Sequence, residues 1–246
     1  MSKQIIDSKT RISIADFKEL IDFKDLFLTL TYREYRVRYA QTVLGFLWVL
    51  IQPLATLIIF TYIFGKAIDV DTQNIPYPVF SMCGISIWTY FSFVVSQSGR
   101  ALINSQSMIQ KIYFPRLVLP ISRGLIGLVD LLVTLLILLI LMFYYGVNPS
   151  LNLIYLPLFI AIAIVLALGV GIWISALTIR FRDFQHIIPF IIQIGLYATP
   201  VAYSSNYIPE KFHNLYYSLN PMAGVVEGFR WSIIGTGSIR PEIYIS

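Results

Sequence analysis

Residues Leu131–Ile179 read LLVTLLILLILMFYYGVNPSLNLIYLPLFIAIAIVLALGVGIWISALTI, and none of these 49 positions carries a charge. A helix needs about 20 apolar residues to cross a bilayer, so the stretch is too long for one span and long enough for two. Gly146-Val147-Asn148-Pro149 has the composition of a turn and divides it. The sequence therefore predicts two membrane-spanning helices, near residues 122–145 and 153–178.

The composition of the whole chain leads to the same class. Of its 246 residues 57% are apolar and 13% are charged, and the mean hydropathy is +0.73. A soluble domain of this length cannot bury so much apolar surface, which excludes a soluble enzyme, and a disordered chain is excluded too. The single cysteine, Cys83, rules out an internal disulfide framework and a cysteine zinc cluster. An all-α integral membrane protein remains, because the apolar runs lack the alternation of a β-barrel.

Other uncharged stretches predict three more spans, near residues 43–65, 78–99 and 187–203. The five spans belong to a transmembrane domain over residues 43–246, which follows an N-terminal segment over residues 1–42. Fourteen of the 18 lysines and arginines precede the first span or lie in the loops after the second and fourth spans. Cytoplasmic loops carry such an excess, so we expect the N-terminus to be cytoplasmic. The net charge of +5 is then explained by the orientation of the chain in the membrane and not by nucleic-acid binding.

Two segments outside the spans are amphipathic or aromatic. Residues 16–31 predict an amphipathic helix in the inner membrane interface, or alternatively a solvated helix packed on a partner. Its apolar face would carry Phe17, Leu20, Ile21, Phe27 and Leu28. The loop between the second and third spans would present Ile112, Tyr113 and Phe114 on a short helix before Pro115. Either a partner protein or the rest of this chain must cover these three side chains.

The segment over residues 205–235 is expected on the outer side. Pro209 and Pro221 each stand where a short helix would begin, with Asn220 as N-cap of the second and Glu227 placed to pair with Arg230. Two helices too short to span predict a re-entrant hairpin beside a translocation pathway, because broken backbone at membrane depth must be buried or line a wet cavity. The alternative is a hairpin that rests on the outer surface.

Single residues give weaker signals. Asp130 is the one acid inside a predicted span, so it is either functional or paired with Arg123 two turns earlier. His186 and His213 fall on opposite sides and cannot share a metal. The chain has no phosphate-binding loop of the Gly-x-x-x-x-Gly-Lys-Ser/Thr type. Aromatic rings suit sugars, and the candidates for lining a pathway are Tyr62, Trp88, Phe91, Tyr197 and Tyr203, with lipid contact or core packing as the alternative.

Four runs, taken in chain order, carry a family resemblance. They are Arg36–Trp48 (RVRYAQTVLGFLW) followed by Pro53, Lys111–Arg116 (KIYFPR) with Pro120, the pair Arg182-Asp183, and Asn220-Pro221 with Arg230 and Gly235. In ABC-2 type permeases the first run resembles the entry into the first span, and the second resembles the loop after the second span. The third resembles the pair after the fourth span, and the last resembles the external segment before the final span. The nearest group is the membrane subunit of O-antigen ABC transporters, with teichoic-acid and capsule exporters near it.

The resemblance implies a bacterial inner-membrane homodimer with two separate ATP-binding subunits, which hold ATP and Mg²⁺. This chain would then have no catalytic residue, metal or cofactor. It implies six spans, with the sixth after Ile245, and a substrate polysaccharide linked to undecaprenyl pyrophosphate. The resemblance also assigns ATPase coupling to Lys111, Ile112, Tyr113, Phe114 and Arg116.

Two further sets of residues are predicted on this basis. Arg36 and Arg38 would lie at the substrate entrance and bind the pyrophosphate, or alternatively anchor the chain to anionic lipids. Asn220, Glu227 and Arg230 would hold an external gate. Rival functions are an ABC-2 permease for teichoic acid, capsule, drugs or lipids, and a membrane enzyme acting on lipid-linked sugars. Such an enzyme needs clustered acids, whereas the acids here are scattered.

Overall fold

The computed structural model describes residues 22–40 and 45–235. The regular elements in these two ranges are all helices, which confirms the all-α class for them. Four are long and apolar enough to cross a membrane, by length and composition. These candidate spans are Leu47–Ala67, Tyr77–Asn104 (α4), Val118–Tyr145 (α6) and Leu151–Arg180, and they overlap the first four predicted spans.

Two of the candidate spans combine different kinds of helix. The first begins as α3 (Leu47–Phe60) and continues as a π-helix, η1 (Thr61–Ala67). The fourth begins with a 3-10 turn, η2 (Leu151–Tyr155), and continues as α7 (Leu156–Arg180). Between α6 and η2, Gly146 adopts φ 68°, a left-handed conformation that a residue without Cβ reaches at no steric cost. The turn therefore lies at the residues whose composition predicted it.

The fifth predicted span is a shorter helix, α8 (Phe184–Ala198), of 15 residues. At about 1.5 Å per residue it reaches roughly 22 Å, less than the ~30 Å thickness of the hydrocarbon core. It ends before the predicted limit at residue 203 because Thr199 precedes Pro200 and is extended, with φ −96° and ψ 145°.

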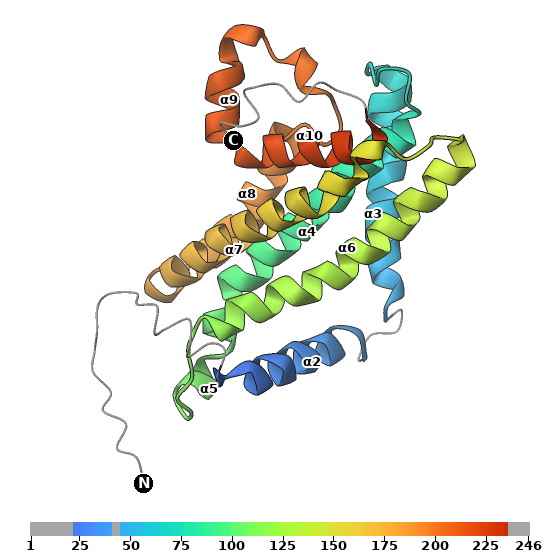
Figure 1. Cartoon of the computed structure of the whole chain (residues 1–246). Coiled ribbons are helices and arrows are strands. Elements are labelled where there is room, and N and C mark those ends of the chain that lie inside the picture. The colour runs from blue at the N-terminus through green and yellow to red at the C-terminus, as the bar shows by residue number, and fades with distance from the viewer. Residues whose placement is uncertain (1–21, 41–44, 236–246) are drawn as a thin grey trace.

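Helix α4 lies at the centre of the molecule. It contacts α3, α6, α7, α8 and α10 (Pro221–Ile234). Figure 1 shows α6 and α7 running beside it at a tilt while α10 crosses one end of the bundle. Side chains along the first half of α4 are fully buried, among them Met82, Cys83 and Ile87. The core of the protein is therefore built around one helix, to which the other helices are attached.

Helix α7 approaches α4 closely at Gly171. A Cβ atom on Gly171 would lie 2.7 Å from the Ser98 Cβ, too close for two carbons. Small residues at a helix crossing allow the backbones to come together and gain van der Waals contact. On the other side, the Ser98 hydroxyl donates to the Pro120 carbonyl at 2.9 Å, which joins α4 to α6.

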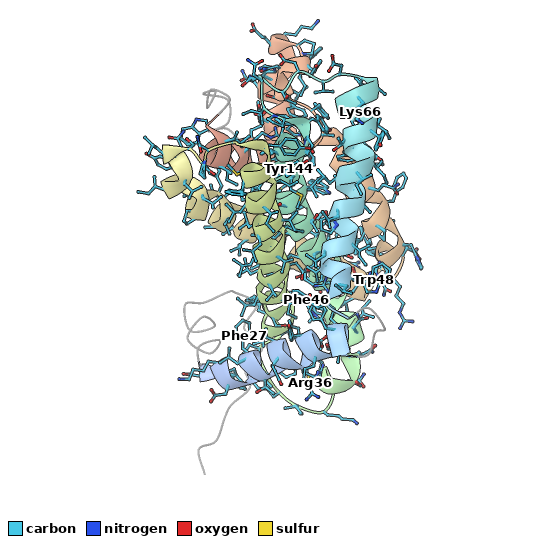
Figure 2. The ribbon with its side chains drawn as sticks, turned by 90° about the vertical axis from the view of Figure 1, so that its right-hand side faces the viewer. Phe27, Arg36, Phe46, Trp48, Lys66 and Tyr144 are labelled. Atoms are coloured by element: carbon cyan, nitrogen blue, oxygen red, sulfur yellow. The ribbon has the colours of Figure 1, made fainter. Side chains whose placement is uncertain are left out.

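The end of the bundle near the N-terminus is crossed by α2 (Lys24–Ala40), with α5 (Gln106–Ile109) beside it (Figure 1). Figure 2 places Phe27 and Arg36 at this end and Lys66 and Tyr144 at the other. The predicted helix over 16–31 overlaps α2 only in part, and Phe17, Leu20 and Ile21 lie outside the described residues.

Helix α2 packs through a small apolar cluster. Leu30 is buried against Ala101 and Phe114, and Phe27 packs on the same cluster, whereas Leu28 is 59% exposed. This chain therefore covers Phe27 and leaves Leu28 uncovered, and the prediction that the apolar face meets the membrane interface or a partner stays a prediction. The Leu28 side chain is left for lipid or a partner because neighbours one residue apart point in different directions on a helix.

The opposite end is covered by four short helices. In chain order they are η3 (Ser205–Tyr207), η4 (Glu210–Phe212), α9 (His213–Leu219) and α10. Helix α9 stands away from the bundle while α10 lies on α4 and α7 (Figure 1). Pro221 occupies the first turn of α10 as predicted, and Gly235 ends it at φ 75°. Short helices thus follow Pro209 and begin at Pro221, as the sequence predicted.

We expect Gly171→Ala to destabilise the protein and Gly169→Ala to leave it unharmed. The added methyl at 171 meets the Ser98 Cβ, whereas nothing lies within 4 Å of a Cβ at 169. Overpacking costs about 1–3 kcal/mol, while both variants share the gain of roughly 0.5–1 kcal/mol from replacing helical glycine. Thermal unfolding of the detergent-solubilised variants, followed by size-exclusion chromatography, measures the difference. Equal midpoints would contradict the close crossing.

Candidate functional site

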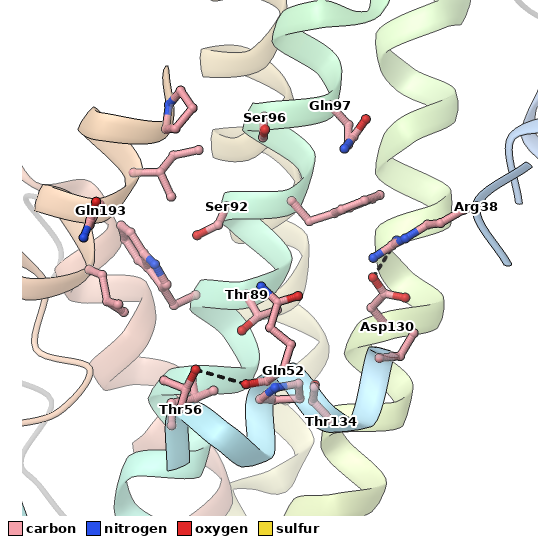
Figure 3. Close-up of a pocket in the computed structure, with 18 residues that line it drawn as sticks. Arg38, Gln52, Thr56, Thr89, Ser92, Ser96, Gln97, Asp130, Thr134 and Gln193 are labelled. Atoms are coloured by element: carbon pink, nitrogen blue, oxygen red, sulfur yellow. Dashed lines mark hydrogen bonds and ion pairs between the residues drawn. The ribbon is translucent and has the colours of Figure 1, made fainter. Parts of the chain in front are cut away.

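A polar cavity of about 490 Å³ lies between α3, α4, α6 and α8. Its long wall is a stripe on α4 that runs from Ile85 to Gln97 with helical spacing of three and four residues. Twelve residues of helix extend about 18 Å, so the cavity follows much of a membrane's depth. Figure 3 shows polar side chains from several helices turned into this space. Those labelled are Arg38, Gln52, Thr56, Thr89, Ser92, Ser96, Gln97, Asp130, Thr134 and Gln193.

Most of these polar side chains are not satisfied by hydrogen bonds within the described part of the protein. Within the described residues, the side-chain amides of Gln52, Gln97 and Gln193 make no hydrogen bond. The Ser92 hydroxyl is buried and also has no partner there. Polar groups at membrane depth are costly unless they meet water, a ligand or another protein surface. The cavity therefore offers donors and acceptors to something outside this protomer.

An ion pair lies at the end of the cavity near α2. The Arg38 guanidinium is 2.7 Å from the Asp130 carboxylate, and the Tyr39 hydroxyl donates to the other carboxylate oxygen at 2.6 Å. Arg38 also lies over the Phe93 ring, 4.0 Å from its centroid. Asp130 is only 4% exposed, so these partners take the place of the water that its carboxylate lacks. Burial, and then the hydrogen bond to Asp130, raise the pKa of Tyr39.

The prediction that Arg123 pairs with Asp130 was wrong. Arg123 instead holds Glu34 of α2 at 2.6 Å. Helix α2 brings Glu34 and Arg38, one turn apart, against two positions on α6, and each finds an opposite charge there. Burial opposes ionisation of Glu34, yet the neighbouring Arg33 and Arg123 outweigh it and lower the pKa of the carboxyl. The two ion pairs join α2 to α6.

The predicted entrance arginines are separated by the structure. Arg38 lies at the cavity and is neutralised by Asp130. Arg36 is exposed and has the Tyr32 ring 6.0 Å from its guanidinium carbon. Positions two apart point away from each other on a helix, so the pair cannot hold one phosphate group together.

The predicted coupling loop contains both exposed and buried residues. Lys111, Ile112, Tyr113 and Arg116 are exposed, with Ile112 at 60% and Tyr113 at 57%. Phe114 is 5% exposed and packs in the cluster with Leu30. The interpretation that this chain covers the aromatic patch therefore holds for Phe114, because α2 lies directly against the loop.

The predicted lining aromatics do not gather at the cavity. Trp88 lines it, and the Phe91 ring lies 5.4 Å from Trp88 without reaching the cavity. Tyr62 and Tyr197 are 62% and 56% exposed elsewhere, and Tyr203 donates to the Tyr197 carbonyl. Sequence reasoning selected rings and missed the amides and hydroxyls. Their signal was polar residues recurring every three or four positions within α4, an otherwise apolar helix.

The predicted gate residues make contacts other than those expected. Arg230 is 4% exposed and does not pair with Glu227. Its guanidinium donates to the carbonyls of Phe80, Pro200 and Val201 at 3.3, 2.8 and 3.2 Å, and its central carbon is 3.8 Å from the Phe80 ring centroid. Pro200 and Val201 follow the end of α8, so no helical N–H pairs with their carbonyls, and a guanidinium with five donors satisfies both together with the Phe80 carbonyl of α4.

The other two gate residues hold the same region. Glu227 accepts hydrogen bonds from the Ser205 backbone N–H at 3.1 Å and from the Tyr217 hydroxyl. Asn220 does not cap α10 with its side chain, which donates to the Ala198 carbonyl and the Thr199 hydroxyl at 3.3 and 3.0 Å. The three residues thus fasten α9 and α10 to the end of α8 and to the start of α4.

A set of apolar helices that encloses a polar cavity at membrane depth defines a membrane permease. The chain belongs to the ABC-2 type transporter family, whose model matches residues 25–234. It is 32% identical over 223 residues to an O-antigen export system permease protein RfbA of Klebsiella pneumoniae, which covers 90% of this chain and 84% of that protein. A Myxococcus xanthus protein of the same name is 29% identical over 215 residues, 87% of this chain and 82% of that one. The Polysialic acid transport protein KpsM of Escherichia coli is 25% identical over 210 residues, 82% and 78% of the two chains.

We expect Arg230→Met to destabilise the protein strongly. The change removes three hydrogen bonds from a buried charged group, each worth about 1.5–3 kcal/mol, and leaves carbonyls unpaired. Arg36→Met is the control, since Arg36 is exposed. Heating followed by size-exclusion chromatography gives the midpoint for each variant. If Arg230→Met unfolds at the same temperature as the control, Arg230 does not hold this end of the molecule.

The Glu34–Arg123 pair predicts a pH-dependent attachment of α2. Because the pKa of Glu34 is lowered on folding, its contribution is present above the ordinary value of 4.5 and is lost as the pH falls through the lower folded value. The protection of the α2 amides, measured as their exchange rate relative to the intrinsic rate at the same pH, should therefore fall only in acid. Glu34→Gln should exchange fast at neutral pH and lose this dependence, while the double swap Glu34→Arg with Arg123→Glu should restore slow exchange. Unchanged exchange in Glu34→Gln would contradict the assignment.

Proposed function

We propose that this chain is the membrane-spanning subunit of an ATP-driven exporter that moves a lipid-linked polysaccharide from the cytoplasm across the bacterial inner membrane. The single observation that carries the proposal is the cavity over roughly 18 Å of α4, whose amides and Ser92 hydroxyl have no hydrogen-bond partner in the part of the chain that the structure describes. Sugars present hydroxyls that both donate and accept, and side-chain amides do the same. Relatives named for O-antigen and polysialic acid transport support the polymer class.

A homodimer would complete the pathway. Gln52 on α3 and Gln193 on α8 line the cavity and are exposed in the protomer. Exposed amides at membrane depth are unfavourable against lipid, so a second copy is their natural neighbour. A symmetric pair would place two such walls face to face and enclose a wider path. A path of many weak contacts lets a polymer advance without stalling.

ATP hydrolysis is assigned to a separate subunit that binds ATP and Mg²⁺. Lys111, Ile112, Tyr113 and Arg116 form an exposed patch beside α5, at the end of the bundle crossed by α2. An apolar centre with a basic rim suits a protein partner. We place this end in the cytoplasm because, among the described residues, it carries the lysines and arginines of α2 and of the loop after α4.

The lipid pyrophosphate is expected to meet Arg36 first. Arg36 is exposed on α2, whereas Arg38 is already engaged by Asp130. A guanidinium beside the membrane interface binds phosphate oxygens through charge-assisted hydrogen bonds. An exposed arginine on α2, two positions before the cavity residue Arg38, would hold the head group while the sugars enter.

Copurification and transport test the proposal together. The chain and an ATP-binding subunit, encoded beside it or taken from an O-antigen exporter, are expressed and reconstituted into vesicles with a fluorescent lipid-pyrophosphate oligosaccharide. We expect ATP-dependent movement of the sugar across the bilayer. Ile112→Asp should abolish capture of the ATPase and leave the permease folded. Leu219→Asp is the matched control, since Leu219 is 76% exposed at the opposite end. Equal capture by both variants, or sugar movement without ATP, would refute the assignment.

A further inference from the structure

The lining of the cavity carries information about the charge of the polymer. We infer that the pathway is built for a polysaccharide of uncharged sugars and discriminates against a polyanionic one. This inference rests on the proposed function and deepens it, because relatives of this chain are named for both O-antigen and polysialic acid transport.

The groups that are free to contact a substrate are all neutral. The amides of Gln52, Gln97 and Gln193 and the Ser92 hydroxyl have no hydrogen-bond partner in the described protomer. Trp88 adds an aromatic face to the same lining. An amide supplies two donors and one carbonyl acceptor, which match a sugar hydroxyl in either direction. Neutral donors alone hold a carboxylate far less well than an arginine or lysine does.

The charged residues of the lining cancel each other. Arg38 and Asp130 are the two charged members, and their charged atoms are 2.7 Å apart. Arg38 is further held over the Phe93 ring and Asp130 by the Tyr39 hydroxyl. The pair contributes no net charge to the cavity and leaves no cation for an anionic sugar.

A second copy would not change this balance. The helices whose exposed faces flank the cavity are α3 and α8, and neither Leu47–Phe60 nor Phe184–Ala198 contains Asp, Glu, Lys or Arg. In a symmetric dimer each half contributes the same lining, so a neutral half gives a neutral whole. A polymer with a carboxylate on every sugar would then pass many unpaired charges through a low-dielectric path, which is costly.

Two substrates that differ in one functional group test the inference. One is a lipid-pyrophosphate oligosaccharide of hexoses, and the other has the same length and linkage but is oxidised to a carboxylate at C6 of each sugar. Both are offered to the permease with its ATPase in vesicles. We expect the carboxylate form to move slower by roughly tenfold or more. Equal rates would overturn the inference, and movement of neither substrate would count against the proposed function itself.

Variants of the ion pair show whether charge in the cavity sets the preference. Asp130→Asn leaves Arg38 without its counter-charge, so the ratio of hexose to carboxylate transport should fall toward one. Glu34→Gln breaks the other α2–α6 ion pair without changing the cavity's charge, and it should keep the wild-type ratio. A ratio is unaffected by the amount of folded protein. If both variants shift it equally, loosening of α2 and not cavity charge is responsible, and the inference fails.

Binding of the oligosaccharide, measured without transport, gives a second test of the inference. Trp88 fluorescence should respond to the free neutral oligosaccharide and not to its carboxylate form, and the response should vanish in Trp88→Phe. A stronger response to the carboxylate form would overturn the inference even if transport could not be reconstituted.

Discussion

Every polar group at membrane depth must either find a partner in the protein or line a space that water or a ligand can fill, and this constraint shapes the molecule. Helices satisfy their own backbone, so the difficult places are the helix ends and the polar side chains. The clearest case is the segment just after α8, where Thr199-Pro200 stops the helix and the carbonyls of Pro200 and Val201 have no helical N–H to accept. Arg230 reaches them from α10 and is itself buried by the contact. Arg230 therefore holds α10 on the bundle by pairing with the carbonyls that follow α8.

The same constraint explains why α4 is central. One side of this helix is buried against α6 and α7 and contains close crossings such as Gly171 on Ser98. Another side carries the polar stripe that lines the cavity, including Thr89 and Ser92. Placed at the edge of the bundle, that stripe would face lipid. Surrounded by other helices, it faces a space that water or a substrate can fill. Stability and a polar path thus depend on one helix that other helices enclose.

The sequence predicted features that neighbouring residues determine, but it did not predict contacts between residues far apart in the chain. Charge-free runs predicted the first four spans, and Pro221 and Gly146 marked a helix start and a turn, because each signal acts over a few residues. The ion pairs were mispredicted because Arg123 and Asp130 have partners on α2, about 90 positions earlier in the chain. Trp88 was found among the lining residues because aromatic rings stand out, whereas Gln97 and Gln193 became visible only once the helices were assembled.

The two ion pairs between α2 and α6 serve different parts of the molecule although they resemble each other. Glu34–Arg123 lies away from the cavity, so it can only attach α2. Arg38–Asp130 lines the cavity, so it both attaches α2 and sets the charge that a substrate meets. An acid buried at 4% exposure without its arginine would be strongly unfavourable, as would the arginine without the acid. Keeping both residues gives this end of the cavity a charge-balanced contact between α2 and α6. Movement of α2 relative to α6 would have to break this pair, so any opening at this end of the cavity is coupled to a change in its charge.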